Sequence, residues 1–236
     1  GNIHELEGDS NSTLMEILRD AGLDIEAAWG GCCACATCHV YINDKWLEKL
    51  DSKDDDDYQS IFAMKNGSVA APTASLHFTN PLIQILKNKG INIATITLHI
   101  GLGTFLPVKT NNINDHKMHE EYGEVNQDVI EKLNDTRSKN GRVIAVGTST
   151  MRILETVSLN KETPGYRGLT NIFIKPGFEF KLVDLLITNF HLPKSTLLML
   201  ACAFTGKINI MNAYKHAIKN NYRFYSYGDA TLLYKK

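Results

Sequence analysis

The feature that most constrains the fold is the alternation of strand-like and helix-like segments from Tyr58 onward. Short runs rich in β-branched or alternating apolar residues predict strands, which we place at Tyr58–Met64, Ile91–Ile100, Arg142–Val146, Ile172–Ile174, Leu185–Asn189 and Tyr222–Tyr227. Apolar residues at helical spacing predict helices, which we place at Pro81–Lys89, Asn126–Leu133, Thr148–Val157 and after Pro193 and Asn209. This alternation predicts an α/β fold.

The composition excludes several classes of protein. Hydrophobic residues make up 43% and charged residues 22% of the 236 residues, which excludes wholesale disorder. The longest apolar run, Leu197–Phe204, is too short to cross a bilayer, and the opening residues do not resemble a signal peptide. Four of the five cysteines lie between Cys32 and Cys38, unlike a secreted disulfide framework. We therefore expect a cytoplasmic protein that does not contact a membrane.

Charge is distributed unevenly along the chain. Residues 1–57 hold 14 acidic and 4 basic side chains, whereas residues 58–236 hold 12 acidic and 21 basic ones. The four consecutive acids Asp54–Asp57 are typical of a solvated boundary. We therefore expect two domains, 1–57 and 58–236, the second facing a polyanion. The alternative is that its net charge of +9 reflects no particular partner.

The first predicted domain begins with a helix. Ser12 is typical of a helix N-cap, and the apolar spacing that follows predicts a helix over Thr13–Ala21. Gly22 is typical of a helix end. A loop rich in glycine and cysteine, Trp29–Cys38, precedes a short predicted strand at His39–Ile42.

This loop and its flanks resemble an adrenodoxin-type [2Fe-2S] ferredoxin over residues 8–56, which implies a small α+β fragment. The resemblance puts Cys35 and Cys38 at the second and third iron-ligand positions. Trp29 stands at the first position and cannot coordinate iron, and the matching stretch ends before the fourth. We therefore expect Cys35 and Cys38 to be a vestigial metal site without a [2Fe-2S] cluster. Adventitious metal binding stays an alternative.

The basic domain carries polar motifs at predicted strand and helix ends: Gly67–Ala74, Thr97–Phe105, His116–Tyr122, Gly147–Arg152, Thr188–Thr196 and Tyr222–Asp229. Together they resemble the S-adenosylmethionine:tRNA ribosyltransferase-isomerase family of queuosine biosynthesis. The resemblance is nearly continuous over residues 58–236 and corresponds to the C-terminal half of such an enzyme.

The resemblance implies a transferase with S-adenosylmethionine and tRNA as substrates. Such an enzyme moves and rearranges the ribosyl group of S-adenosylmethionine onto 7-aminomethyl-7-deazaguanine in tRNA, giving epoxyqueuosine and releasing adenine and methionine. We expect an incomplete, barrel-like mixed α/β domain, because the N-terminal half of the family is missing. Truncation is expected to impair catalysis, and a separate chain that supplies the missing half stays an open alternative.

This chemistry requires a general base with a pKa near neutral, which histidine provides. We expect catalytic residues among His99, His116, His119 and His191, with His99 the first choice for proton transfer because it precedes the motif Gly101-Leu102-Gly103. The alternative for His99 is a contact that ties this loop to the core. The spacing of His116 and His119 suits a shared helical face and a catalytic or metal pair, although a third metal ligand is not evident.

Substrate binding requires amide donors, hydroxyls, cations and aromatic rings at the ends of strands and helices. The expected residues are Ser68, Thr73, His77, Gly101, Gly103, Thr104, Gly147, Thr148, Arg152, Glu155, Asn189, Lys194, Ser195, Thr196, Arg223, Tyr227 and Asp229. The structural alternatives are helix capping for the threonines and serines, a helical pair for Arg152 and Glu155, and a core strand for the C-terminal aromatics.

Two functions from other classes stay open. A [2Fe-2S] ferredoxin-type electron carrier would be coloured, and we expect it to be defective because of Trp29. A module that binds tRNA without chemistry would show salt-dependent RNA binding.

Overall fold

The computed structural model describes residue 17 and residues 20–22, 58–68, 70–101, 112–159 and 164–236. The chain divides into two compact units, Gly1–Asp51 and Ser52–Lys236. In the first unit the Ala21 N–H donates to the Ile17 carbonyl at 3.1 Å, and Gly22 has a φ of 69°. Gly22 therefore ends a helical turn, as predicted. The remaining predictions for that unit lie outside the described residues, and a domain boundary at Asp57–Tyr58 stays a prediction.

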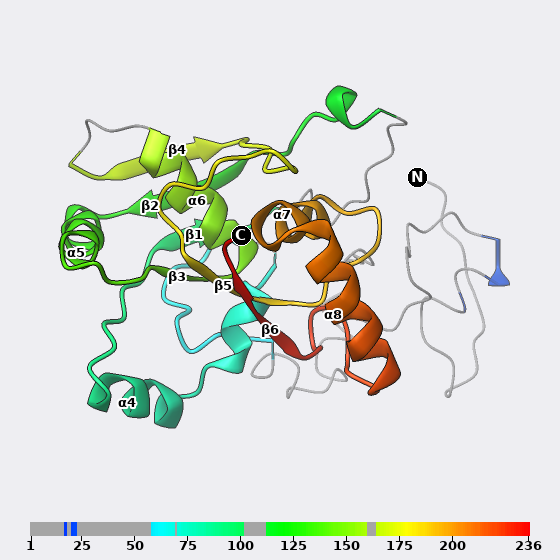
Figure 1. The fold of residues 1–236 in the computed structure, drawn as a ribbon, viewed down its shortest axis with the longest axis horizontal. Coiled ribbons are helices and arrows are strands. Elements are labelled where there is room, and N and C mark those ends of the chain that lie inside the picture. The colour runs from blue at the N-terminus through cyan, green and yellow to red at the C-terminus, as the bar shows by residue number, and fades with distance from the viewer. Residues whose placement is uncertain (1–16, 18–19, 23–57, 69, 102–111, 160–163) are drawn as a thin grey trace, which may run out of the picture. The chain divides into compact units, whose positions relative to one another are not determined.

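The second unit contains two three-stranded sheets (Figure 1). The first has the order β1-β2-β4 and is antiparallel, with β1 at Thr97–His99, β2 at Glu121–Val125 and β4 at Tyr166–Thr170. The second has the order β3-β5-β6, with β3 at Ile144–Val146, β5 at Leu185–Asn189 and β6 at Ala230–Tyr234. In it β3 and β5 are parallel, and β5 and β6 are antiparallel. The prediction of a mixed α/β fold is confirmed.

Five α-helices and two 3-10 helices are found in the part of this unit that the structure describes: η1 (Thr73–His77), α4 (Asn80–Asn88), η3 (Ile113–Asp115), α5 (Gln127–Ser138), α6 (Thr148–Leu159), α7 (Thr196–Thr205) and α8 (Lys207–Lys219). Side chains cap two of the α-helices, because the Thr79 hydroxyl accepts from the Leu82 N–H and the Ser195 hydroxyl accepts from the Leu198 N–H. Gly90, with a φ of 77°, follows α4 as predicted.

Helix α6 supplies side chains to two hydrophobic clusters. Met151 joins the larger cluster, which contains Leu186 of β5 and Phe204 of α7. Ile153 joins the smaller one with Val125 of β2. Both sheets therefore pack against the same helix (Figure 1). A Cβ on Gly123 would lie 2.5 Å from Ile153 Cδ1, so glycine at this position of β2 permits the close approach of α6.

Three predicted strands are wrong. Tyr58–Met64 forms turns and bends rather than a strand. Near Ile172–Ile174 the paired strand is β4, and Ile174 is buried in the larger cluster without strand pairing. The predicted strand Tyr222–Tyr227 does not form, because Tyr225 has a φ of 72° and cannot continue an extended chain. The strand that pairs with β5 is instead β6, which begins at Ala230. Of the predicted strand Ile91–Ile100, only Thr97–His99 pairs.

No single helix within the described residues is long and apolar enough to span a membrane. Helices α7 and α8 together reach the required length and composition, but they meet at an angle of 114°.

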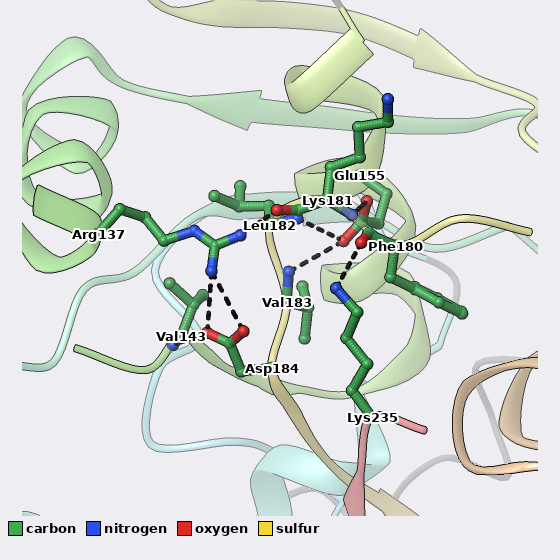
Figure 2. A network of polar contacts seen from close by, with 9 residues as sticks. All are labelled: Arg137, Val143, Glu155, Phe180, Lys181, Leu182, Val183, Asp184 and Lys235. Carbon is green, nitrogen blue, oxygen red and sulfur yellow. Dashed lines mark hydrogen bonds and ion pairs between the residues drawn. The ribbon is translucent and has the colours of Figure 1, made fainter. Parts of the chain in front are cut away.

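A buried carboxylate holds α6 to the segment that leads into β5. Glu155 is fully buried, and its two oxygens accept the backbone N–H groups of Lys181 at 2.8 Å, Leu182 at 3.0 Å and Val183 at 2.9 Å (Figure 2). A buried charge is tolerated only when its hydrogen-bonding capacity is used, and three amide donors meet that need here. Glu155 therefore binds backbone amides of the segment before β5 and does not form the helical pair with Arg152 that was considered as an alternative.

The next residue along this segment, Asp184, continues the network (Figure 2). Its carboxylate accepts the Val143 N–H at 2.8 Å and lies 3.2 Å from Arg137 Nη1 of α5. The Arg137 guanidinium also donates to the Lys181 carbonyl. Together, Glu155 and Asp184 fix the chain on both sides of Val183 before β5 begins.

We expect Glu155→Gln to lower the free energy of unfolding by about 3 kcal/mol, because the new amide group puts a donor against backbone donors and leaves buried N–H groups unsatisfied. Urea denaturation of the two proteins measures the difference. The matched control is Glu179→Gln, an exposed carboxylate in the same loop, which should change stability by less than about 0.5 kcal/mol. Equal midpoints for Glu155→Gln and the wild type would contradict this role.

Candidate functional site

Polar groups converge at the carboxyl edge of the parallel strands β3 and β5. Strand β3 leads through Gly147, with a φ of 92°, into α6, and β5 ends at Asn189. A Cβ on Gly147 would lie 3.7 Å from the Cβ of Ala74, so η1 lies against this turn. The carboxyl edge of parallel strands is where open α/β sheets usually bind ligands. The end of η1 contributes His77, which meets Asn189 there.

The side-chain amide of Asn189 contacts several backbone carbonyls of the C-terminal loop. Its Nδ2 donates to the carbonyls of Tyr225 at 3.0 Å, Ser226 at 3.3 Å and Gly228 at 3.4 Å, and lies 3.3 Å from His77 Nε2. Asn189 is buried, and its Oδ1 accepts no hydrogen bond from the described residues. We call His77, Asn189 and residues 225–228 the carboxyl-edge cluster.

The loop of this cluster has unusual backbone geometry at Tyr225 and Gly228. Tyr225 is left-handed, with a φ of 72°, which is uncommon for a bulky residue. A Cβ on Gly228 would lie 2.4 Å from the Phe224 carbonyl carbon, so only glycine allows this approach. Strained backbone persists where the surroundings hold it, and here Asn189 supplies that restraint.

The contact between Asn189 and His77 leaves the imidazole tautomer open. The Asn189 amide nitrogen has two hydrogens and also faces three loop carbonyls, so its 3.3 Å approach to His77 Nε2 does not fix which ring nitrogen carries the proton. Burial is the main cause that lowers the His77 pKa below its ordinary value of 6.5; Asp229 opposes this shift and Arg223 adds to it. The lowered pKa favours the neutral form of His77, which is the form that accepts a proton.

An ion pair closes the ends of the loop. The Arg223 backbone N–H donates to Asp229 Oδ2 at 2.7 Å, and the Arg223 guanidinium lies 3.3 Å from Asp229 Oδ1. The backbone hydrogen bond is the main cause that lowers the Asp229 pKa. Tyr227 lies in the same loop, with its ring 5.7 Å from that of Tyr58. Arg223 and Asp229 therefore flank the carboxyl-edge cluster, and Tyr227 belongs to it.

His191 follows β5 closely, and one of its ring nitrogens contacts a neighbouring hydroxyl. His191 Nε2 lies 2.9 Å from the Thr188 hydroxyl, and the Tyr214 hydroxyl accepts the His191 backbone N–H at 2.7 Å. Burial lowers the pKa of His191 to about 4 and raises that of Tyr214 to about 12. An imidazole with so low a pKa is a weak base at pH 7. Proton transfer by His191 stays a prediction.

Other predicted binding residues near β5 begin α7. Ser195 caps the helix, Thr196 is its first residue, and Lys194 is left-handed with a φ of 56°. The capping alternative for Ser195 is therefore confirmed, while substrate contacts by these three residues stay a prediction.

A second buried network surrounds Arg152. Its guanidinium lies 2.7 Å from Glu121 Oε2 and donates to the carbonyls of His119 at 3.1 Å and Ile172 at 3.2 Å. The Ser149 hydroxyl donates to Glu121 Oε1 at 3.1 Å. Arg152 and Glu121 are each at most 2% exposed. The guanidinium is thus satisfied by protein groups, and substrate binding by Arg152 or Glu155 stays a prediction.

His116 and His119 do not share a helical face, contrary to expectation. Both lie in an irregular segment between η3 and β2, with ring centroids 6.4 Å apart, and His116 packs 5.4 Å from the Phe173 ring. Burial, and secondarily His119, lowers the His116 pKa. Within the described residues no group of three or more histidines, cysteines or acids is arranged to hold a metal ion. A catalytic role for the pair stays a prediction.

His99 ends β1 in the other sheet. Its ring lies 5.4 Å from that of Tyr122, and a Cβ on Gly67 would lie 2.9 Å from His99 Nδ1. The Ser68 hydroxyl accepts the Ile100 N–H at 2.9 Å and donates to the Ala70 carbonyl at 2.8 Å. These contacts tie the preceding loop to β1. A proton-transfer role for His99 stays a prediction.

The structure therefore gathers some predicted residues and separates others. The carboxyl edge brings together His77, Gly147, Asn189, Arg223, Tyr227 and Asp229. Thr73 begins η1, Thr148 begins α6, and Gly101 follows β1. The candidates Cys35, Cys38, Gly103 and Thr104 lie outside the described residues.

Sequence reasoning missed Glu121, Thr188, Tyr214 and the carbonyls of residues 225–228. Thr188 could have been selected from the sequence, because it is a polar residue near the end of a predicted strand. Tyr214 and the loop carbonyls have no local signal, because their partners are distant in sequence.

Comparison with known proteins gives a consistent result. A family model described as queuosine biosynthesis protein matches residues 24–233. S-adenosylmethionine:tRNA ribosyltransferase-isomerases from Thermotoga petrophila and Halothermothrix orenii are 56% and 57% identical over 176 and 177 residues. Each alignment covers 75% of this chain and 52% of the relative. The Staphylococcus aureus enzyme of that name is 54% identical over 190 residues, which cover 79% of this chain and 54% of the relative.

A solved structure is also similar. The S-adenosylmethionine tRNA ribosyltransferase of Thermotoga maritima superimposes with a TM-score of 0.58 at 48% identity, covering 67% of this chain and 50% of that one. The chain thus spans about half the length of the curated relatives it matches.

The low pKa of His191 makes stability depend on pH. Its pKa is about 4 in the folded protein against 6.5 as the ordinary value, so the unfolded chain binds the proton more tightly. The free energy of unfolding is therefore expected to fall by on the order of 2 kcal/mol as pH drops from 6.5 towards 4. Urea denaturation at several pH values should show a shallower decline for His191→Gln. The exposed control His216→Gln should keep the wild-type slope, and identical slopes in all three proteins would be inconsistent with this assignment.

Proposed function

The chain belongs to the queuosine biosynthesis protein family, and from this premise we propose that it contributes to the transfer and isomerisation of a ribosyl group from S-adenosylmethionine to tRNA. The proposed acceptor is 7-aminomethyl-7-deazaguanine, and the proposed product is epoxyqueuosine, with adenine and methionine released. The observation that carries the proposal is the carboxyl-edge cluster, which joins residues from η1, β5 and the C-terminal loop of a chain 56% identical to enzymes of that name.

His77 is the proposed proton acceptor. The reaction needs a base for the proton beside the sulfonium, and an imidazole that is neutral at pH 7 fits this need. His77 has a lowered pKa and partial exposure, whereas the basicity of His191 is far weaker. Asn189 orients the His77 ring through Nε2. His99, His116 and His119 stay alternative candidates, and they lie at the other sheet or in the segment leading to it.

The chain is proposed to act together with the rest of the family's length, because it covers only 52% of relatives such as the Thermotoga petrophila enzyme. In this proposal residues 58–236 correspond to the family's C-terminal half, and a separate chain is one source of the remainder. We also propose that the remaining length completes a barrel-like domain. The proposed location is the cytoplasm, where tRNA is available.

The N-terminal segment is proposed to be a vestigial ferredoxin-like fragment over residues 8–56. The support is the spacing of Cys35 and Cys38, and the argument against a working electron carrier is Trp29 at a ligand position. The family match begins at residue 24, so the two assignments share residues 24–56. Visible absorption after anaerobic reconstitution with iron and sulfide distinguishes them: a colourless protein agrees with the vestigial assignment, and a red-brown one contradicts it.

The test of the proposed function is adenine release from S-adenosylmethionine in the presence of tRNA that carries 7-aminomethyl-7-deazaguanine. The chain is assayed alone and with a polypeptide that supplies the other half of a relative. His77→Gln should lower kcat by about 100-fold or more, with a smaller change in the KM for S-adenosylmethionine. Lys87→Gln, an exposed change on α4, is the control.

The pH profile provides a second readout. Because a base must be unprotonated and the His77 pKa is lowered, the acid-side decline of wild-type kcat/KM should have its midpoint below pH 6.5. Adenine release by neither the chain nor its mixture would contradict the proposed function, and full activity of His77→Gln would contradict the role of His77.

A further inference from the structure

Helix α8 has an unusual charge pattern. Its 13 residues, Lys207–Lys219, include three lysines and one histidine but no aspartate or glutamate. Helix α5 differs, because its Lys132 and its C-cap residue Lys139 each pair with an aspartate four residues earlier, at 3.4 and 2.8 Å. Among the described residues no ion pair involves a lysine of α8.

The helical spacing aligns two of the three α8 lysines, Lys215 and Lys219, on the outward side. Ile210 and Ala217 are each 1% exposed and define the buried face. On the opposite face, Lys215 and Lys219 are exposed and lie one turn apart. Like charges at this spacing repel each other and destabilise the helix unless an anion compensates them. Lys219 also favours the helix C-terminus, but Lys215 lies more than a turn inside it.

This line continues towards the carboxyl-edge cluster. Tyr222 follows α8, is 44% exposed as a residue, and has its ring 6.1 Å from the His216 ring. Arg223 comes next, with a side chain 76% exposed, and its partner Asp229 acts electrostatically on His77. In Figure 1 the chain leaves α8 through this segment and returns to β6. We call Lys215, Lys219, Tyr222 and Arg223 the cationic ridge.

We propose that the cationic ridge binds the phosphate backbone of the tRNA substrate and directs the RNA to the carboxyl-edge cluster. The inference rests on the proposed function and names the surface that contacts the RNA. Lysine and arginine bind phosphates by charge and contribute little sequence information. An exposed tyrosine beside them provides a face on which an unpaired base stacks.

A protein partner fits this surface less well. Ile208, Met211 and Ile218 are exposed on α8 as well, at 77%, 41% and 65%. However, Lys215 and Lys219 occupy the middle of the exposed face, and lysine is depleted from the cores of protein interfaces because its desolvation is costly. A polyanion compensates both charges.

The test compares Lys215→Gln/Lys219→Gln with the wild-type chain in binding fluorescent tRNA that carries 7-aminomethyl-7-deazaguanine. At about 0.1 M salt the double variant should bind roughly tenfold or more weakly, because two phosphate contacts are lost. The slope of log Kd against log salt should decrease by about 1.5 to 2. The matched control, Lys132→Gln/Lys139→Gln, removes the same charge from α5 and should bind tRNA like the wild type.

Further readouts separate the possible outcomes. Equal urea midpoints for the two double variants would show that the fold is retained, and unchanged S-adenosylmethionine binding would show that the loss is specific to RNA. If Lys215→Gln/Lys219→Gln bound tRNA with the wild-type affinity and salt slope, tRNA binding by the cationic ridge would be overturned, and the proposed function would be unaffected. Weakened assembly with a chain that supplies the other half, at unchanged tRNA affinity, would also overturn it and make α8 a protein interface. A wild-type chain, with or without that half, that binds no tRNA at low salt would contradict the proposed function as well.

Discussion

The arrangement of the second unit depends on two buried charges of α6. Arg152 binds Glu121 of β2 and the carbonyls next to that sheet, whereas Glu155 accepts three amides of the segment that leads into β5. Burying a charge is costly unless protein groups satisfy it, and here both are satisfied by backbone that is distant in sequence. One helix therefore holds two sheets in a defined relation, and its first turn is fixed beside β5.

That fixed turn makes the carboxyl edge a suitable place for chemistry. Asn189, at the end of β5, holds the C-terminal loop and orients the His77 ring. Burial lowers the pKa of both His77 and His191, and it lowers that of His191 to about 4. His77 is the proposed proton acceptor, and a catalytic role for His191 stays a prediction.

The charge distribution links this site to its proposed substrate. The net charge of +9 over residues 58–236 is not spread evenly among the helices. Helix α5 neutralises Lys132 and Lys139 internally, whereas α8 leaves its lysines without an acid on the helix. The chain that follows α8 reaches the carboxyl-edge cluster through Arg223. An RNA bound along α8 would therefore approach the proposed proton acceptor from the side of that loop.

Local sequence patterns were sufficient for the α/β class, for the bounds of β5 and for the starts of α4 and α6 within a residue, because caps and short-range apolar spacing specify such elements. The motif Thr188–Thr196 at the end of a predicted strand marked Asn189 as a binding candidate, whereas His77 was selected through the family resemblance. Local patterns failed at Tyr222–Tyr227, where a left-handed tyrosine and contacts with Asn189 outweigh a strand-like alternation. Nor could they pair Arg152 with Glu121 or Glu155 with the 181–183 amides, because such partners meet only when separate sheets pack on one helix.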